Sequence, residues 1–208
     1  MKTWTHRTLA MGIATAAVAM AVSGCAPVTG AQNVHPPDPI DLHHGATVAV
    51  AAGMASGSSE GGGLAGGSIG WEFNRTVGLE GSGAWFDRGL GADAFSAALT
   101  VRTNLTRWHS WTPFVEGGPA MYRASFDTSR RAIPDFYRGR SADTSAVTIA
   151  FRDPAFVIAG GVNVLTLGHF AIRPAVDVLM VARNSRGYHV GSLAVRGVYY
   201  FETHAAAP

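Results

Sequence analysis

The sequence contains a single cysteine, Cys25, and a single lysine, Lys2, and every other basic residue is an arginine. One cysteine cannot form a disulfide bond within one copy of the chain, which excludes a disulfide-stapled scaffold. Charged residues are also scarce, because they make up 14% of the 208 residues whereas 47% are hydrophobic. This balance excludes a disordered chain and predicts one domain of moderate size. The 26 glycines are unusually many for a soluble enzyme.

The N-terminal segment has the pattern of a signal peptide. Two basic residues precede an uncharged apolar run at 8–22, which is shorter than the ~20 residues of a membrane-spanning helix. The next residues, Val22-Ser23-Gly24-Cys25, resemble the bacterial lipobox, in which the cysteine is diacylated and becomes the new N-terminus. We predict a signal peptide over 1–24 with lipid attached to Cys25. Ordinary cleavage beyond it, for example after Ala31, is the alternative.

Removal of this segment changes the charge balance. The full chain has a net charge of +2 and a pI of about 9.0. Cleavage before Cys25 removes two basic residues and no acidic one, which leaves 14 of each. Binding to a polyphosphate needs a net or clustered positive charge, so we expect no nucleic-acid partner.

Residues 25–45 read as a Pro-rich linker on the periplasmic side of the membrane. The linker contains His35, His43 and His44, but no acidic residue or thiol lies at ligand spacing from them. We therefore expect solvated histidines and no metal site.

From Ala46 onward the apolar residues recur with a period of two, which predicts an all-β domain over 46–202, followed by a tail at 203–208. We predict eight strands, most of them near the ~9 to 11 residues of a tilted membrane strand, at 46–53, 66–73, 77–86, 94–104, 112–122, 155–165, 169–181 and 190–202. Alternation at 146–151 indicates that the sixth strand begins earlier and projects beyond the membrane.

The predicted connections alternate in length. Three are short, whereas those at 54–65, 87–93, 127–154 and 182–189 are longer. Short turns at one end and long loops at the other are typical of an outer-membrane barrel with both termini in the periplasm.

The two faces of the predicted strands differ in chemistry. The outward face of each strand is uncharged and largely apolar, whereas a soluble barrel has its polar face outside. The inward faces carry three arginines and four carboxylates, which can pair across the lumen: Glu72, Glu80, Arg102, Glu116, Arg173, Asp177 and Arg196. Of these, Asp177 and Arg196 are the best single pair. Pro119 and Pro174 lie inside two strands, where each predicts a bulge or a local break.

Aromatic residues gather near the ends of the predicted strands. One group lies near the short turns and another, Trp85, Tyr122, Phe126, Phe156 and Tyr188, near the long loops. Two such girdles are typical of a barrel that crosses a bilayer.

Three stretches carry a family resemblance: Pro113 to Gly118, the hairpin from Gly160 to Val176, and the closing Gly197-Val198-Tyr199-Tyr200-Phe201. Together they resemble the bacterial outer-membrane β-barrel superfamily of small, porin-like proteins. The resemblance implies an eight-stranded antiparallel up-and-down transmembrane β-barrel in an outer membrane of the Gram-negative type. It also implies that the barrel assembly machinery is a partner. The chain departs from that pattern because its last aromatic residue, Phe201, is followed by the tail.

These features favour a structural or surface-interaction role with a plugged lumen, in contact with outer-membrane lipid. The loop at 127–154 contains five arginines, which could bind lipopolysaccharide phosphates, but four aspartates leave a net charge of only +1. We find no set of nucleophile, base and orienting group, and we expect neither catalysis nor a cofactor. The alternative is a periplasm-facing lipoprotein with a soluble, lipocalin-like barrel that binds a small apolar ligand.

Overall fold

The structure is a computed structural model, and it describes residues 45–57, 61–89, 91–106, 111–130, 133, 137, 147–167, 169–183 and 186–201. It contains eight strands: β1 (Gly45–Ser56), β2 (Gly61–Glu72), β3 (Val77–Asp87), β4 (Ala92–Asn104), β5 (Trp111–Asp127), β6 (Thr148–Leu167), β7 (Phe170–Arg183) and β8 (Arg186–Tyr200). Cys25, the predicted signal peptide and most of the predicted linker lie outside the described residues, as do Glu202 and the predicted tail.

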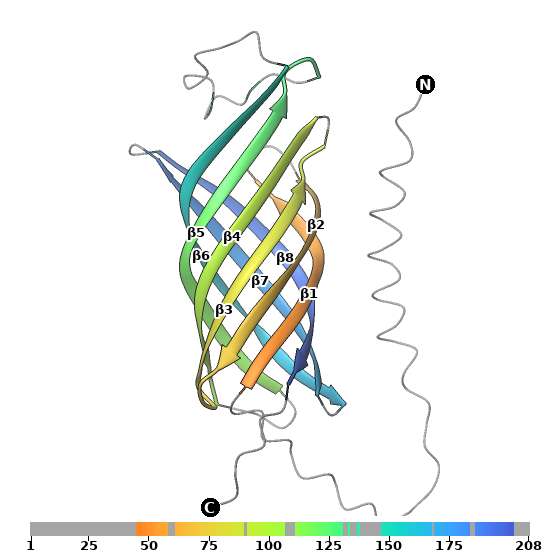
Figure 1. Ribbon diagram of the computed structural model, residues 1–208, viewed down its shortest axis with the longest axis vertical. Helices are drawn as coiled ribbons and strands as arrows, with labels where there is room; N and C mark the ends of the chain where they lie inside the picture. The colour runs from red at the N-terminus through yellow and green to blue at the C-terminus, as the bar shows by residue number, and fades with distance from the viewer. Residues whose placement is uncertain are drawn as a thin grey trace, which may run out of the picture. The chain divides into compact units, whose positions relative to one another are not determined.

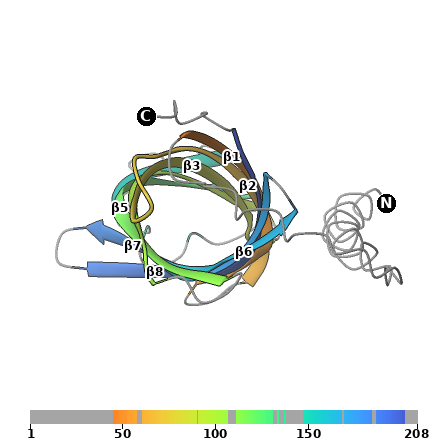
Figure 2. The same ribbon diagram turned by 90° about the horizontal axis from the view of Figure 1, so that it is seen from below.

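The eight strands form one closed barrel. Each strand pairs antiparallel with its neighbours in sequence, and β1 pairs with β8 to close the ring (Figure 1, Figure 2). The predicted fold class, an eight-stranded antiparallel transmembrane barrel, is confirmed. Both ends of the barrel chain meet on the same rim, where the Phe201 amide donates to the Ala46 carbonyl at 2.9 Å.

The predicted alternation of short and long connections is wrong. The strands extend further than predicted, so that β2 begins at Gly61 and only residues 184 and 185 separate β7 from β8. Glycine and serine residues that the sequence pattern assigned to loops instead continue the hydrogen-bonded pairing of the strands, because backbone hydrogen bonds need no side chain. One long connection remains, at 128–147, and β6 begins early at Thr148, as the alternation there predicts.

Each proline interrupts the sheet on one side only. At Pro119 the pairing toward β6 continues, whereas the pairing toward β4 lapses over two residue pairs. At Pro174 the pairing toward β8 continues, whereas the pairing toward β6 lapses over two. Proline has no N–H to donate, which accounts for a one-sided break. The register is the same on both sides of each gap, so the local break is present and the bulge is not.

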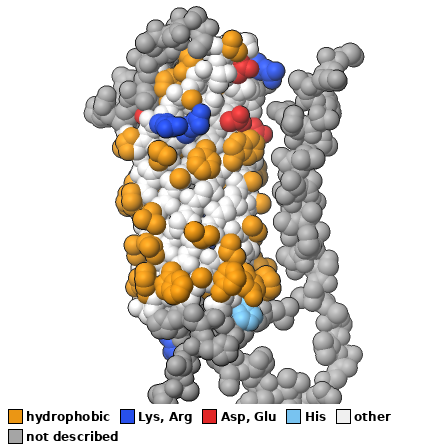
Figure 3. Space-filling view, in the orientation of Figure 1, with side chains coloured by type: hydrophobic (Ala, Val, Ile, Leu, Met, Phe, Trp, Pro, Cys, Tyr) orange, Lys and Arg blue, Asp and Glu red, His pale blue; other side chains and the backbone are white. Residues whose placement is uncertain are grey.

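The outer wall of the barrel carries an apolar belt. Large hydrophobic side chains with 39–71% of their surface exposed point outward from every strand, and Figure 3 shows such side chains in bands across the visible face of the wall. On β5 the outward series runs from Trp111 to Met121, ten steps of ~3.3 Å, or a height of ~25 Å at a ~40° tilt. That height matches the apolar band of a membrane barrel.

The upper aromatic girdle differs from the prediction. Trp85 and Phe156 are outward, together with Phe95, but Tyr122 and Phe126 each have only 1% of their surface exposed and point into the barrel, as does the buried Tyr188. Projecting strands place these three residues above the belt, where the inside of the barrel needs filling. Within the part of the chain that the structure describes, no helix is both long and apolar enough to cross a membrane.

Candidate functional site

The lumen contains a network of ion pairs centred on Glu80 of β3. Its carboxylate accepts hydrogen bonds from the guanidinium groups of Arg102 at 2.5 Å, Arg173 at 2.8 Å and Arg196 at 3.1 Å. Only 2% of the Glu80 surface is exposed. One carboxylate therefore joins three arginines on β4, β7 and β8.

Arg102 and Arg173, both fully buried, have different sets of partners. Arg102 also donates to Glu72 on β2, so two carboxylates surround it. Arg173 has Glu80 as its carboxylate, and its other hydrogen bonds go to Asn163 Oδ1 at 2.6 Å and the Tyr200 hydroxyl at 3.3 Å. Arg173 therefore depends on Glu80 more than Arg102 does.

Arg196 links the remaining two carboxylates. It donates to Glu116 Oε1 at 2.8 Å and to Asp177 Oδ1 at 2.9 Å, and Ser192 donates to the other Asp177 oxygen at 3.2 Å. Arg173 and Arg196 stand directly opposite each other on β7 and β8. Two like charges in that position are unfavourable unless an anion lies between them, and Glu80 contacts both.

The structure thus brings together all seven of the lumen residues proposed from the sequence. The sequence reasoning missed the neutral partners Asn163 and Tyr200, both buried. Their positions on the inward faces of β6 and β8 indicate that both side chains enter the lumen. Because both are neutral, a search for charged residues does not find them.

A small cavity lies above the ion pairs. It measures about 70 Å³, its walls include the small residues Gly66, Ser68, Ser82 and Ser96, and its charged floor includes Glu116. Since one water molecule needs ~10–15 Å³ on this measure, a few waters fit. Glu116 Oε2 is buried without a hydrogen bond from the described residues, so a polar occupant suits the cavity.

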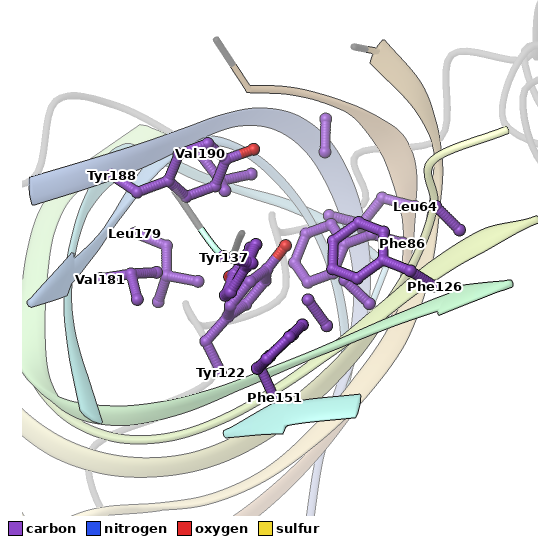
Figure 4. Packing of buried hydrophobic residues seen from close by; sticks show 14 of the residues in the cluster. Leu64, Phe86, Tyr122, Phe126, Tyr137, Phe151, Leu179, Val181, Tyr188 and Val190 are labelled. Atoms are coloured by element: carbon purple, nitrogen blue, oxygen red, sulfur yellow. The ribbon is translucent and has the colours of Figure 1, made fainter. Parts of the chain in front are cut away.

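An aromatic layer fills the lumen on the far side of the cavity. Tyr137, from the long connection, lies at the centre of this group (Figure 4). The Tyr137 ring stacks on the Phe151 ring with centroids 4.7 Å apart, and the centroid of the Phe126 ring lies 5.3 Å from that of Tyr137. Strands β2, β3, β7 and β8 add the apolar side chains Leu64, Phe86, Leu179, Val181 and Val190.

Arg88 covers part of this layer, a role that no sequence pattern indicated. It follows β3 and donates to the hydroxyl groups of Tyr122, at 2.5 Å, and of Tyr188. Its guanidinium also lies 5.2 Å from the centre of the Tyr188 ring, a cation–π distance. The lumen therefore has a charged half and an aromatic half.

His189 and Ser192, a histidine and a serine close together in sequence on β8, are not placed as a base and a nucleophile. His189 is exposed on the outward face, whereas Ser192 faces the lumen and donates to Asp177. Among the described residues, no three of His, Cys, Asp and Glu are placed to hold a metal ion. Most of the loop arginines lie outside the described residues. Arg130 is exposed and forms an ion pair with Asp127 at 3.2 Å.

Comparison with known proteins depends on structure alone, because no family model and no curated protein sequence matches the chain. Neisserial surface protein A is 12% identical, with a TM-score of 0.57, over 75% of this chain and 96% of that one. The N-terminal β-barrel domain of Pseudomonas aeruginosa OprF is 15% identical, with a TM-score of 0.52, over 75% and 99%. The fold is that of a small outer-membrane β-barrel.

A third structure of the same kind is Yersinia pestis Ail, the attachment invasion locus protein, in complex with the heparin analogue sucrose octasulfate. It is 13% identical, with a TM-score of 0.51, over 76% of this chain and 98% of that chain. At such identities the likeness concerns the fold. The exterior of this chain's barrel is apolar and its interior holds ion pairs. A soluble, lipocalin-like barrel requires the reverse, with a polar exterior and an apolar interior.

Proposed function

We propose that this chain is an outer-membrane β-barrel protein with a structural or surface-interaction role, and that its own side chains plug the lumen. The observation that carries the proposal is the combination of an apolar belt outside with an ion-paired network inside. Lipid acyl chains can cover the apolar belt, and the ion-paired network supplies carboxylates to the arginines that the lumen buries.

Two layers support a plugged lumen. The ion pairs connect opposite walls across the bore, and the aromatic layer lies between the cavity and the rim that carries the long connection. An eight-stranded barrel is just wide enough for its side chains to fill it. We propose a protein that neither conducts ions nor catalyses a reaction.

We further propose that both termini face the periplasm. The ends of β1 and β8 share one rim, and the longest connection, 128–147, belongs to the other. Long connections are usual on the outer side of such barrels. In this orientation, lipid on Cys25 adds a second membrane anchor on the periplasmic side. The barrel assembly machinery contacts the chain from the periplasm. The loop at 127–154 faces the lipopolysaccharide of the outer leaflet.

Two measurements on the purified, folded protein test the proposal. Electrophoresis in SDS with and without boiling should show a heat-dependent change of mobility, and the protein should stay in the membrane fraction after carbonate extraction. A planar-bilayer recording should show no conductance steps. Extraction by carbonate without a mobility shift would refute membrane insertion, and reproducible unit steps would refute the plug.

A further inference from the structure

The ion-paired network carries one more negative charge than positive charge. Among the described residues it joins four carboxylates to three guanidinium groups. The aromatic layer does not compensate for this difference, because it adds one residue of each sign: Arg88, and the buried Asp153, which is the register partner of Tyr122. A charge that is taken out of water is costly unless an opposite charge lies close to it. The lumen therefore has a place for one further cation.

Glu116 on β5 is the carboxylate with the least compensation. Its Oε1 accepts a hydrogen bond from Arg196, but the same guanidinium group also donates to Glu80 and Asp177. Its Oε2 is buried and has no hydrogen-bond partner among the described residues, and only 4% of the side-chain surface is exposed. Glu72 Oε2 also lacks a partner there, but Glu72 does not line the cavity above the network, whereas Glu116 does. The surplus negative charge therefore lies beside the cavity.

The cavity offers room and oxygen ligands beside Glu116. Its volume of about 70 Å³ admits a small ion together with a few water molecules, each of which needs ~10–15 Å³. Ser82 and Ser96 line it, and their hydroxyl groups form no hydrogen bond within the described part of the chain. Arg196 lines it too, but both of its terminal nitrogens already donate to carboxylates. Carboxylate, hydroxyl and water oxygens are ligands that hard cations prefer, so the cavity suits a hard cation.

We propose that this cavity binds one sodium ion through Glu116 Oε2 and the hydroxyl groups of Ser82 and Ser96, with water molecules as the remaining ligands. A single positive charge neutralises the surplus of the network. A divalent ion would overcompensate, and in the part of the chain that the structure describes no three acidic side chains are placed to hold one. The site rests on the proposed function, because only a plugged lumen keeps an ion at a fixed place instead of letting it pass.

Unfolding of the full chain by urea in phosphatidylcholine vesicles tests the site, because unfolding separates the ligands and releases the ion. The wild type would be compared in sodium chloride and in N-methylglucamine chloride, both at about 0.1 M. General screening is then equal, and only sodium is small enough for the cavity. We expect the unfolding equilibrium constant to be about tenfold smaller in sodium chloride, as for a site with a Kd of about 10 mM.

Three variants locate the ion. In E116Q the difference between the two salts should vanish, because the carboxylate ligand is lost. The variant S82A/S96A keeps every charge and loses two hydroxyl ligands, so the difference should shrink, and this variant decides the matter if E116Q does not fold. The matched control D93N removes the same charge as E116Q from an exposed carboxylate of β4, and it should keep the full difference.

Several outcomes would overturn the site. Equal unfolding constants of the wild type in the two salts would mean that water or a proton, and not sodium, occupies the cavity. A difference that persists undiminished in E116Q or in S82A/S96A, or one that disappears in D93N as well, would mean that sodium acts elsewhere on the protein or on the vesicles. The heat-dependent mobility and the bilayer recording of each sample, measured in parallel, separate failure of this site from failure of the barrel proposal and of the plug.

Discussion

Replacement of Glu80 by glutamine should destabilise the barrel more than the same change at Glu72. Among the described residues, Glu80 has the only carboxylate that contacts Arg173, a residue with no exposed surface, and the variant E80Q removes it. In the described part of the chain, Arg173 then has only uncharged partners, whereas Arg102 keeps Glu72, and Arg196 keeps Glu116 and Asp177. Loss of one partner from a buried pair costs about 3–5 kcal/mol of unfolding free energy. In E72Q, Arg102 keeps Glu80, so we expect about 1–2 kcal/mol.

The assay is unfolding by urea in lipid vesicles, followed by the mobility of unboiled samples and by tryptophan fluorescence. A double-mutant cycle sharpens it. The variant E80Q/R173M removes both the carboxylate and the cation of one buried pair. Its loss of unfolding free energy should therefore be clearly smaller than the sum of the losses in E80Q and R173M. Equal losses for E80Q and E72Q, or additive effects of E80Q and R173M, would show that Glu80 is not the centre of the network.

Three further predictions concern other parts of the chain. Gly118→Ala should be destabilising by about 1–3 kcal/mol, because its methyl group would collide with the Leu99 carbonyl; Gly63→Ala, which meets nothing within 4 Å, is the matched control, and equal stability of the two variants would contradict the reasoning. Tyr137→Ala should lower the unfolding free energy by about 3–5 kcal/mol, the usual cost of truncating a buried aromatic ring, and an unchanged urea midpoint would show that the ring does not support the aromatic layer. Palmitate should label the wild type but not Cys25→Ala, and absence of label from both would end the lipidation proposal.

The sequence predicted the inside and outside of the barrel because, over the height of the apolar belt, the charged residues of the strands all have the inward parity; outward charges such as Arg123 on β5 occur only beyond the belt. Arg173 and Asp177 share one parity, and the other parity of the same strand is uncharged, from Phe170 to Met180. This parity does not depend on the residue at which a strand is predicted to begin. Strand ends were poorly predicted, because Gly61 to Gly63 have no side chains that report whether the backbone is paired.

Contacts across the bore could not be predicted from a single sequence. Which residues face each other there depends on how far each strand is staggered around the ring, and no local pattern records this. Arg88 and Tyr137 illustrate the limit, since both come from outside the strands and enter the lumen only once the barrel exists. Tyr122 illustrates the opposite error, because an aromatic residue near a strand end was assigned to the lipid interface.

The separation in sequence between Glu80 and its partners bears on how the barrel folds. Arg173 lies 93 residues from Glu80, and Arg196 lies 116 residues away. Their charges can be neutralised together only after β3 faces β7 and β8 across a closed ring, so an open sheet would expose unpaired arginines and carboxylates. Contacts over such distances form slowly, because closing a long loop costs entropy before any contact compensates for it. Closure and insertion into the bilayer should therefore occur together in one cooperative, slow step, with no stable half-barrel in lipid.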